Sequence, residues 1–176
     1  MKSIPNLSGT ARTWAMPTGS LPVSAIRTVY VERAVAEHPR TRSVLGRLRA
    51  ARTIPCDRYG EVFNRRAQSF RLQKERPALI LAEKHDGHVL RAPREYDVGG
   101  DENFYFSHLL NCPYDCRYCF LQGMFRSAHF VLFVNYESFQ EAIDRRLAEA
   151  GDRPAWFFSG YDCDSLALEG LTGFCA

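Results

Sequence analysis

The sequence lacks any long apolar segment. A membrane-spanning helix needs about 20 consecutive, mostly apolar residues, and no run among the 176 residues approaches that length. Lys2 is not followed by the apolar segment that a secretory signal requires. We therefore expect no membrane partner and, with reduced cysteines, a cytoplasmic location.

Acidic residues are scarce in the first part of the chain. Residues 1–100 hold 18 Lys and Arg against nine Asp and Glu, whereas residues 101–176 hold five against eleven. A basic half suits a polyanion such as DNA. A solvated arginine-rich surface, or attraction between two oppositely charged halves, explains the same numbers, and charge alone slightly favours these two explanations.

The sequence also lacks an internal repeat, and its length suits one ordinary domain. Residues 1–25 are rich in Pro, Gly, Ser and Thr, which predicts a flexible leader. The charge balance changes at Gly99-Gly100-Asp101. We therefore divide the rest into a basic N-terminal domain, residues 26–100, and a second unit, residues 101–176.

Patterns within the basic part predict short α/β elements. Residues 27–31 and 78–82 are β-branched or apolar runs typical of strands, and residues 32–50 are helical with a break near His38-Pro39. Arginines surround the apolar positions of this helix. A second basic stretch, residues 65–76, interleaves arginines with aromatic residues, which stack on bases in some proteins but more often belong to the core.

The second part alternates strands with a helix. The predicted strands are residues 103–109, 129–134 and 155–158, and the predicted helix is residues 136–150, capped by Asn135. This order indicates an α/β fold with a parallel sheet. The last strand opens into a polar loop, residues 159–164.

Three of the six cysteines, Cys112, Cys116 and Cys119, are spaced C-x3-C-x2-C between the first two of these strands. Three close thiolates favour a soft metal. Zinc would need a fourth ligand, such as His108 or His129. An iron–sulfur cube held by three cysteines keeps one iron open. A disulfide explanation is weak, because one of the three cysteines would be left over.

Tyr118, an aromatic residue just before the last cysteine, favours the cluster. The pattern C-x3-C-x-aromatic-C resembles the signature of radical S-adenosylmethionine (SAM) enzymes. The resemblance implies a [4Fe-4S] cluster on the three cysteines, with S-adenosyl-L-methionine bound to the open iron. It also implies reductive cleavage of SAM to a 5′-deoxyadenosyl radical, and an electron donor such as flavodoxin or ferredoxin.

Flanking residues narrow this resemblance. Residues 118–122, followed by residues 133–135 before a helix, resemble the spore photoproduct lyase family, as do residues 29–32 and 54–55. The implied fold is an incomplete radical SAM partial (β/α) barrel, starting at residue 101, preceded by a basic N-terminal α/β extension. The implied activity is a carbon–carbon lyase reaction in DNA repair that splits a thymine photodimer by hydrogen abstraction.

The same resemblance suggests roles for the polar loop. Ser159, Gly160 and Asp162 lie where the family's strand-end loop meets SAM, so we expect them, with Tyr118, to contact the cofactor. Asp162 would accept the SAM ammonium. An ordinary strand-to-helix turn rich in Gly and Asp is an equal alternative.

Two positions depart from the lyase pattern. Phe120 replaces a tyrosine, and Ser159 lies nearest the position of the cysteine that returns hydrogen to the product, leaving Cys163 as a substitute. The chain is also short for a barrel enzyme. We therefore expect it to correspond to the N-terminal portion of such an enzyme and not to repair spore photoproduct. Whether it is an enzyme stays open. The alternatives are a truncated, non-catalytic metal-binding module that binds nucleic acid, and an inactive remnant.

Overall fold

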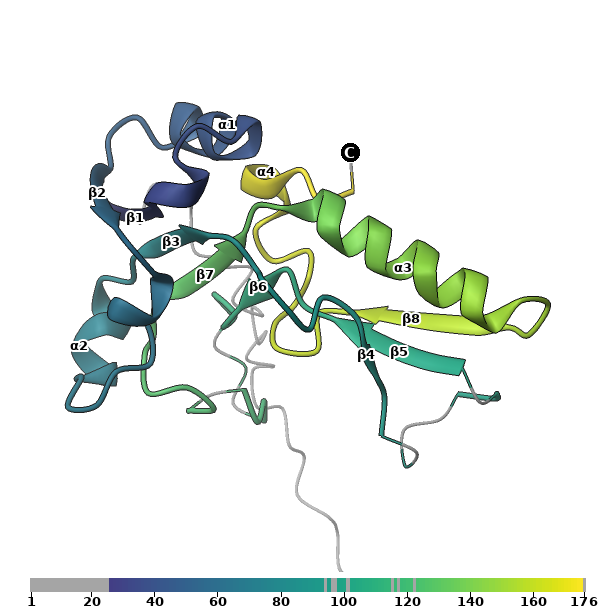
Figure 1. Ribbon diagram of the computed structural model, residues 1–176. Helices are drawn as coiled ribbons and strands as arrows, with labels where there is room; N and C mark the ends of the chain where they lie inside the picture. Colours follow the sequence, from purple (N-terminus) through teal and green to yellow (C-terminus); the bar gives the residue numbers. More distant parts are fainter. Residues whose placement is uncertain are drawn as a thin grey trace, which may run out of the picture.

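The computed structural model describes residues 26–93, 95, 98–100, 102–114, 116, 118–121 and 123–175, so the predicted leader lies outside the described residues. Figure 1 shows the arrangement of the elements. The strands are β1 (Thr28–Glu32), β2 (Arg52–Cys56), β3 (Leu79–Ala82), β4 (Leu90–Arg91), β5 (Glu102–Phe106), β6 (Leu109–Leu110), β7 (Phe130–Phe133) and β8 (Ala155–Ser159). The helices are α1 (Pro39–Arg47), α2 (Phe70–Glu75), α3 (Tyr136–Ala150) and α4 (Glu169–Thr172), with short 3-10 turns at Arg33–Val35 and Tyr59–Glu61.

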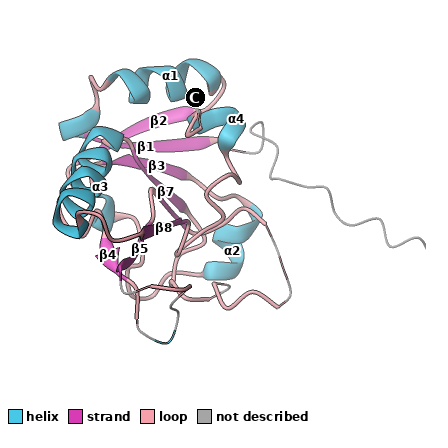
Figure 2. Ribbon diagram, turned by 90° about the vertical axis from the view of Figure 1, so that its right-hand side faces the viewer, coloured by secondary structure: helices cyan, strands magenta, loops and turns pink. Residues whose placement is uncertain are grey.

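Five strands form the larger sheet, in the order β2-β1-β3-β7-β6. The first four are parallel, and β6 runs antiparallel to β7. Every residue of β3 and β7 is buried, as expected for central strands of a parallel sheet that is covered on both faces. Val44 of α1 packs in the core cluster of one face, and Phe63, just before α2, packs in that of the other. Figure 2 shows the strands side by side between these helices.

Three strands form the smaller sheet, in the order β4-β5-β8, with β5 and β8 parallel. Helix α3 covers one face, where Ala142 packs against Phe104, and the Phe104 ring stacks on Phe157 with centroids 5.2 Å apart. Trp156 and Phe158 remain 45% and 37% exposed. Among the described strands, β8 has β5 as its single neighbour.

Most sequence expectations for the elements are confirmed, including the helix over residues 136–150 and the parallel pairing within the second part. The single sheet implied for that part is wrong, because β7 pairs with β3 and not with β5 or β8. β7 is apolar on both faces, like β3, whereas three of the five residues of β8 are exposed. No helix of the described residues has the length and apolarity needed to cross a membrane.

Glu32 is a buried carboxylate, 1% exposed, at the carboxyl end of β1. Its Oε1 accepts a hydrogen bond from the backbone N–H of Tyr59, and its Oε2 accepts one from that of Glu83 at 3.0 Å. Doubly wound sheets usually bind ligands between strands such as β1 and β3, where the chain reverses its direction of winding. Here the side chain of Glu32 occupies that position.

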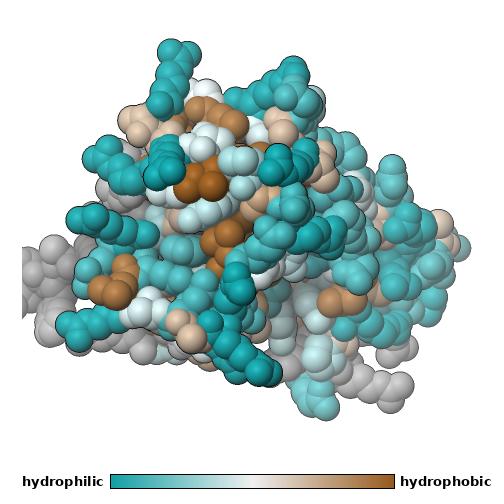
Figure 3. Space-filling model, turned by 60° about the vertical axis from the view of Figure 1, so that its left-hand side comes forward, coloured by the Kyte–Doolittle hydropathy of each residue, from teal (hydrophilic) through white to brown (hydrophobic). Residues whose placement is uncertain are grey.

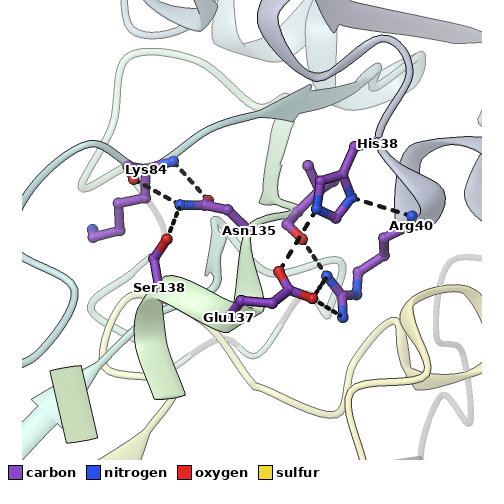
Figure 4. A network of polar contacts seen from close by, with 7 residues as sticks. His38, Arg40, Lys84, Asn135, Glu137 and Ser138 are labelled. Carbon is purple, nitrogen blue, oxygen red and sulfur yellow. Dashed lines mark hydrogen bonds and ion pairs between the residues drawn. The ribbon is translucent and has the colours of Figure 1, made fainter. Parts of the chain in front are cut away.

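The start of α3 is held to the larger sheet by Asn135, as Figure 4 shows. Its Oδ1 accepts from the Lys84 backbone N–H at 2.9 Å, and its Nδ2 donates to the Lys84 carbonyl at 2.9 Å and to Ser138 Oγ at 3.1 Å. Asn135 therefore occupies the predicted N-cap position, but its side chain bridges to the segment just after β3 and does not cap the helix. Arg40 of α1 adds an ion pair to Glu137 at 3.2 Å. These contacts fix α3, which leads into β8, against the first part of the chain.

Candidate metal and cofactor site

The base of the cysteine loop is closed by Asn111. This residue has a φ of +64°, in the left-handed region that Asn tolerates better than most residues. Its buried Nδ2 donates to the carbonyl oxygens of Ser127 at 2.6 Å and His129 at 2.8 Å. The chain entering the loop is therefore bonded directly to the chain leaving it.

The segment that leaves this loop is attached to α2. Gln73 Oε1 accepts from Ser127 Oγ at 3.0 Å and from the backbone N–H of Ala128 at 2.9 Å. The backbone N–H of Arg126 donates to Asn64 Oδ1 at 2.8 Å. The basic stretch around α2 thus lies directly beside the cysteine loop.

Cys112, Cys116 and Cys119 are free, half-buried thiols. The backbone N–H of Cys119 donates to the Cys116 carbonyl at 3.0 Å, which forms a turn. Tyr118 and Phe120, on either side of Cys119, are 93% and 72% exposed. The aromatic side chain that marks the motif therefore faces solvent, and its contact with a cofactor stays a prediction.

Cys112 connects the cysteine loop to the polar loop after β8. The backbone of Asp164, in the polar loop, lies close enough to the Cys112 sulfur to affect its ionisation. Burial raises the pKa of the Cys112 thiol, and the backbone N–H groups of Tyr114 and Asp164 oppose the shift. Two loops separated by about 50 residues in the sequence thus meet at the first predicted metal ligand.

Cys163 lies next to this junction but is enclosed. It is 5% exposed and packs among apolar side chains that include Leu109 and Leu168. Burial, and then the neighbouring Cys112, raise the pKa of its thiol far above the ordinary value. A hydrogen donor must reach its acceptor, so the proposed role of Cys163 requires the loop to open.

Gly160 shapes the polar loop. Its φ is +82°, and a Cβ at this position would lie 2.9 Å from the Cys163 carbonyl oxygen and 2.9 Å from the Ser165 nitrogen. The chain thus folds back on itself here, and only glycine fits. Ser159 Oγ lies 3.0 Å from Ser165 Oγ, so the serine predicted to meet SAM is already hydrogen-bonded within the loop.

Asp162 is held through its backbone, whose N–H donates to the buried Ser107 Oγ at 3.0 Å. Lys84 lies near enough for the Asp162 charge to act on it: burial lowers the pKa of Lys84, and Asp162 and Asp86 oppose the shift. The Lys84 Nζ lies 4.9 Å from the centre of the Phe133 ring. Sequence reasoning missed Ser107 and Lys84, because one serine and one lysine after strands carry no distinctive spacing.

The two histidines considered for zinc have other surroundings. His108 is 1% exposed, and its ring stacks on Phe174 at 3.9 Å; burial lowers its pKa to about 4. Neither of its nitrogens has a hydrogen-bond partner within the described chain. His129 Nδ1 accepts from the backbone N–H of Ala78 at 3.1 Å. Neither ring completes a metal site with the three cysteines among the described residues.

The donor set nevertheless has the chemistry of an iron–sulfur site. Three free thiols on one loop, anchored at its base and beside a second loop, are the ligands that such clusters use. In the described part of the chain, no three His, Cys, Asp or Glu side chains are gathered at metal-binding distance. The residues are therefore of the type that binds an iron–sulfur cluster. Ligation would require the loop to bring its three thiols together.

Comparisons with known proteins identify the fold. No protein-family profile and no curated protein match this sequence. Solved structures do match it, and among them is a spore photoproduct lyase variant with bound AdoMet and a dinucleoside spore photoproduct, at a TM-score of 0.68 and 14% identity. Another is spore photoproduct lyase complexed with dinucleoside spore photoproduct, at a TM-score of 0.65 and 13% identity.

Each of these matches covers 84% of this chain and 43% of the lyase chain. The chain therefore spans less than half the length of the structures that it matches. Because the identity is low, the likeness concerns the fold. The resemblance to spore photoproduct lyase that the motifs indicated is confirmed at that level: this chain has the fold of one part of the lyase.

Proposed function

We propose that this chain is the cluster-bearing part of a radical SAM protein of the spore photoproduct lyase type. The observation that carries the proposal is that the polar loop meets the segment leading to Cys112, where the Asp162 backbone N–H donates to Ser107 Oγ, within a fold shared with the lyase. Cys112, Cys116 and Cys119 would hold a [4Fe-4S] cluster. Bound to its open iron, SAM would supply a 5′-deoxyadenosyl radical on reduction by a donor such as flavodoxin or ferredoxin.

The residues of the chain have separate tasks in this proposal. Asn111 holds the two ends of the cysteine loop together, which limits the space that the thiols must search. The carboxylate of Asp162 would accept hydrogen bonds from the SAM ammonium, and Gly160 would let the backbone approach the cofactor. Asp162 is suited to this task because the bond from its N–H to Ser107 fixes its backbone.

A DNA photoproduct is the substrate class that the fold suggests, since lyase structures contain a dinucleoside spore photoproduct. Phe120 has no hydroxyl to relay a hydrogen atom, and Ser159 offers an O–H bond too strong to return one. Spore photoproduct itself is therefore not the substrate that these residues favour. The proposed reaction is SAM cleavage followed by hydrogen abstraction, on a related lesion.

Anaerobic reconstitution tests the metal part of this proposal. The protein should become brown, absorb near ~400 nm and contain iron and sulfide. Cys112→Ser, Cys116→Ser and Cys119→Ser should each lose the colour, whereas Cys175→Ser, at an exposed cysteine outside the loop, should keep it. Stoichiometric zinc without iron after reconstitution would refute the proposal.

SAM cleavage is the second readout. With reductant and SAM, the reconstituted protein should release 5′-deoxyadenosine, and Asp162→Asn should weaken SAM binding while leaving iron content unchanged. If Asp162→Asn binds SAM as the unchanged protein does, the role of Asp162 is wrong although the cluster assignment stands.

A further inference from the structure

Arginines gather at the amino edge of the larger sheet, where its parallel strands begin. Arg52 is the first residue of β2, and Arg27 directly precedes β1. The backbone N–H of Arg52 donates to the Arg27 carbonyl at 2.9 Å, so the two residues are neighbours. Arg76 and Arg126 precede β3 and β7, the next two strands in the order of the sheet.

The strand register places the starts of β2, β1, β3 and β7 side by side, and the four arginines lie at or shortly before these starts: Arg52 in β2, Arg27 one residue before β1, Arg76 three before β3 and Arg126 four before β7. Thr28 lies opposite Arg52, Val29 opposite Leu79, and Leu79 opposite Phe130. The four arginines therefore form a row that crosses β2, β1, β3 and β7 in turn. Adjacent strands are about 4.8 Å apart, so it extends about 14 Å.

The four side chains are available to a ligand. All four are exposed, and none makes a side-chain hydrogen bond or ion pair with another described residue. Glu75 is the one acidic residue among the described residues just before these strands. Figure 3, in which the left-hand side of Figure 1 comes forward, shows hydrophilic side chains over most of this side.

Several basic residues elsewhere in the first part are already engaged. Arg40 bonds to Glu137, Arg42 pairs with Glu37, and Arg47 donates to the Gly170 carbonyl at 2.8 Å. The opposite, carboxyl edge of the sheet carries Arg33, Arg58 and Lys84, but acids outnumber them: Glu32, Asp57, Glu61, Glu83, Asp86 and Glu137. The amino edge is therefore the more positive of the two edges.

The row ends at the cysteine loop. Arg126 is in the segment that leaves this loop, and its backbone is bonded to Asn64. Guanidinium groups bind phosphate oxygens in bidentate geometry. Along the axis of duplex DNA each strand carries a charge every ~3.4 Å, so a row of about 14 Å is long enough to face about four phosphates of one strand.

We propose that Arg52, Arg27, Arg76 and Arg126 bind the phosphate backbone of a nucleic acid and direct it toward the cysteine loop. The inference names the binding surface for the DNA substrate of the proposed function. It rests on that function for its biological meaning, but the binding itself needs neither metal nor SAM. An acidic protein is the competing occupant, and the experiment below separates the two.

Salt dependence of binding tests the row. A fluorescent single-stranded 20-mer is titrated with the full chain, without metal, and anisotropy is recorded at 50 and 200 mM salt. Four phosphate contacts predict a loss of about 50-fold in affinity over this interval. The variant Arg27→Gln/Arg52→Gln/Arg76→Gln retains one contact, so it should lose only about threefold.

A matched variant, Arg33→Gln/Arg42→Gln/Arg145→Gln, removes the same charge elsewhere and should keep the steep dependence. An equal loss in both variants would overturn the proposal, because it would reflect net charge alone. If the first variant does not fold, the single changes Arg27→Gln and Arg52→Gln replace it, each lowering the slope of log K against log salt by about 0.7. An unchanged slope would overturn the proposal.

Labelled polyglutamate is the probe for an acidic protein partner. If it binds as tightly as the oligonucleotide, and the first variant loses both equally, the row serves a protein and the nucleic-acid proposal is wrong. If the protein cannot take up iron but still binds the oligonucleotide, the result would support nucleic-acid binding by the arginine row. It would refute only the proposed function.

Discussion

Asn111 is the residue whose replacement tests most directly how the cysteine loop is held. Each of its two side-chain hydrogen bonds contributes about 1 kcal/mol to folding. Its φ of +64° costs an ordinary L-residue about 1 kcal/mol more. Asn111→Ala loses both bonds and meets the full backbone cost, so it should lower the free energy of unfolding by about 3 kcal/mol.

Asn111→Gly is the control, because it loses the same bonds but adopts this backbone freely. It should be destabilised by about 1–2 kcal/mol, and so be more stable than Asn111→Ala. Urea unfolding followed by circular dichroism measures both. The reasoning fails if Asn111→Ala unfolds within 0.5 kcal/mol (about the precision of such measurements) of the unchanged protein, or if Asn111→Gly is the less stable variant.

Two further predictions concern Gly160 and His108. Gly160→Ala should lower the melting temperature clearly, because its Cβ would lie 2.9 Å from two backbone atoms. Gly151→Ala is the control: Gly151 also has a positive φ, but a Cβ there meets nothing within 4 Å, so the melting temperature should fall less. Equal decreases in the two variants would contradict the packing argument. Since burial lowers the pKa of His108 to about 4, the unfolded chain takes up this proton first, so stability should fall as pH drops from 6.5 to 4, by about 3 kcal/mol in total. His108→Phe should flatten urea midpoints over this window, and an unchanged pH profile would refute the assignment.

Local patterns predicted the elements well where one interaction dominates. The helix α3 follows from an apolar stripe and from Gly151 at its end, and its observed bounds are Tyr136–Ala150. The strands β3 and β7 follow from uninterrupted apolar runs. Such runs also predict burial on both faces, because only a covered strand is apolar at consecutive positions.

Pairing between distant segments was harder to predict from the sequence. β7 follows the cysteine loop in the chain, yet it joins β3 of the first part, since the side chains of Leu79 and Phe130 complete one core. Nothing in the local sequence distinguishes that partner from β5. The bridging role of Asn135 was missed for the same reason: capping is local, whereas Lys84 lies 51 residues away.

Part of the candidate site was also predictable. The spacing of the three cysteines identified the loop, but the contact of Cys112 with the Asp164 backbone depends on how two sheets meet. Asn111 carried a weak signal, because asparagine is enriched at positive φ. The enclosure of Cys163 carried no such signal, because its neighbours in the loop are polar and form no apolar pattern.

Glu32 has a consequence for how the larger sheet folds. Its two oxygens bind backbone groups from separate segments, at Tyr59 and at Glu83, and it is almost completely shielded from water. Until both segments arrive, the side chain must keep its hydration, so closing the core around it early is unfavourable. The final desolvation of β1 therefore waits for its neighbours on both sides. We expect these strands to exchange their amide hydrogens as one cooperative unit.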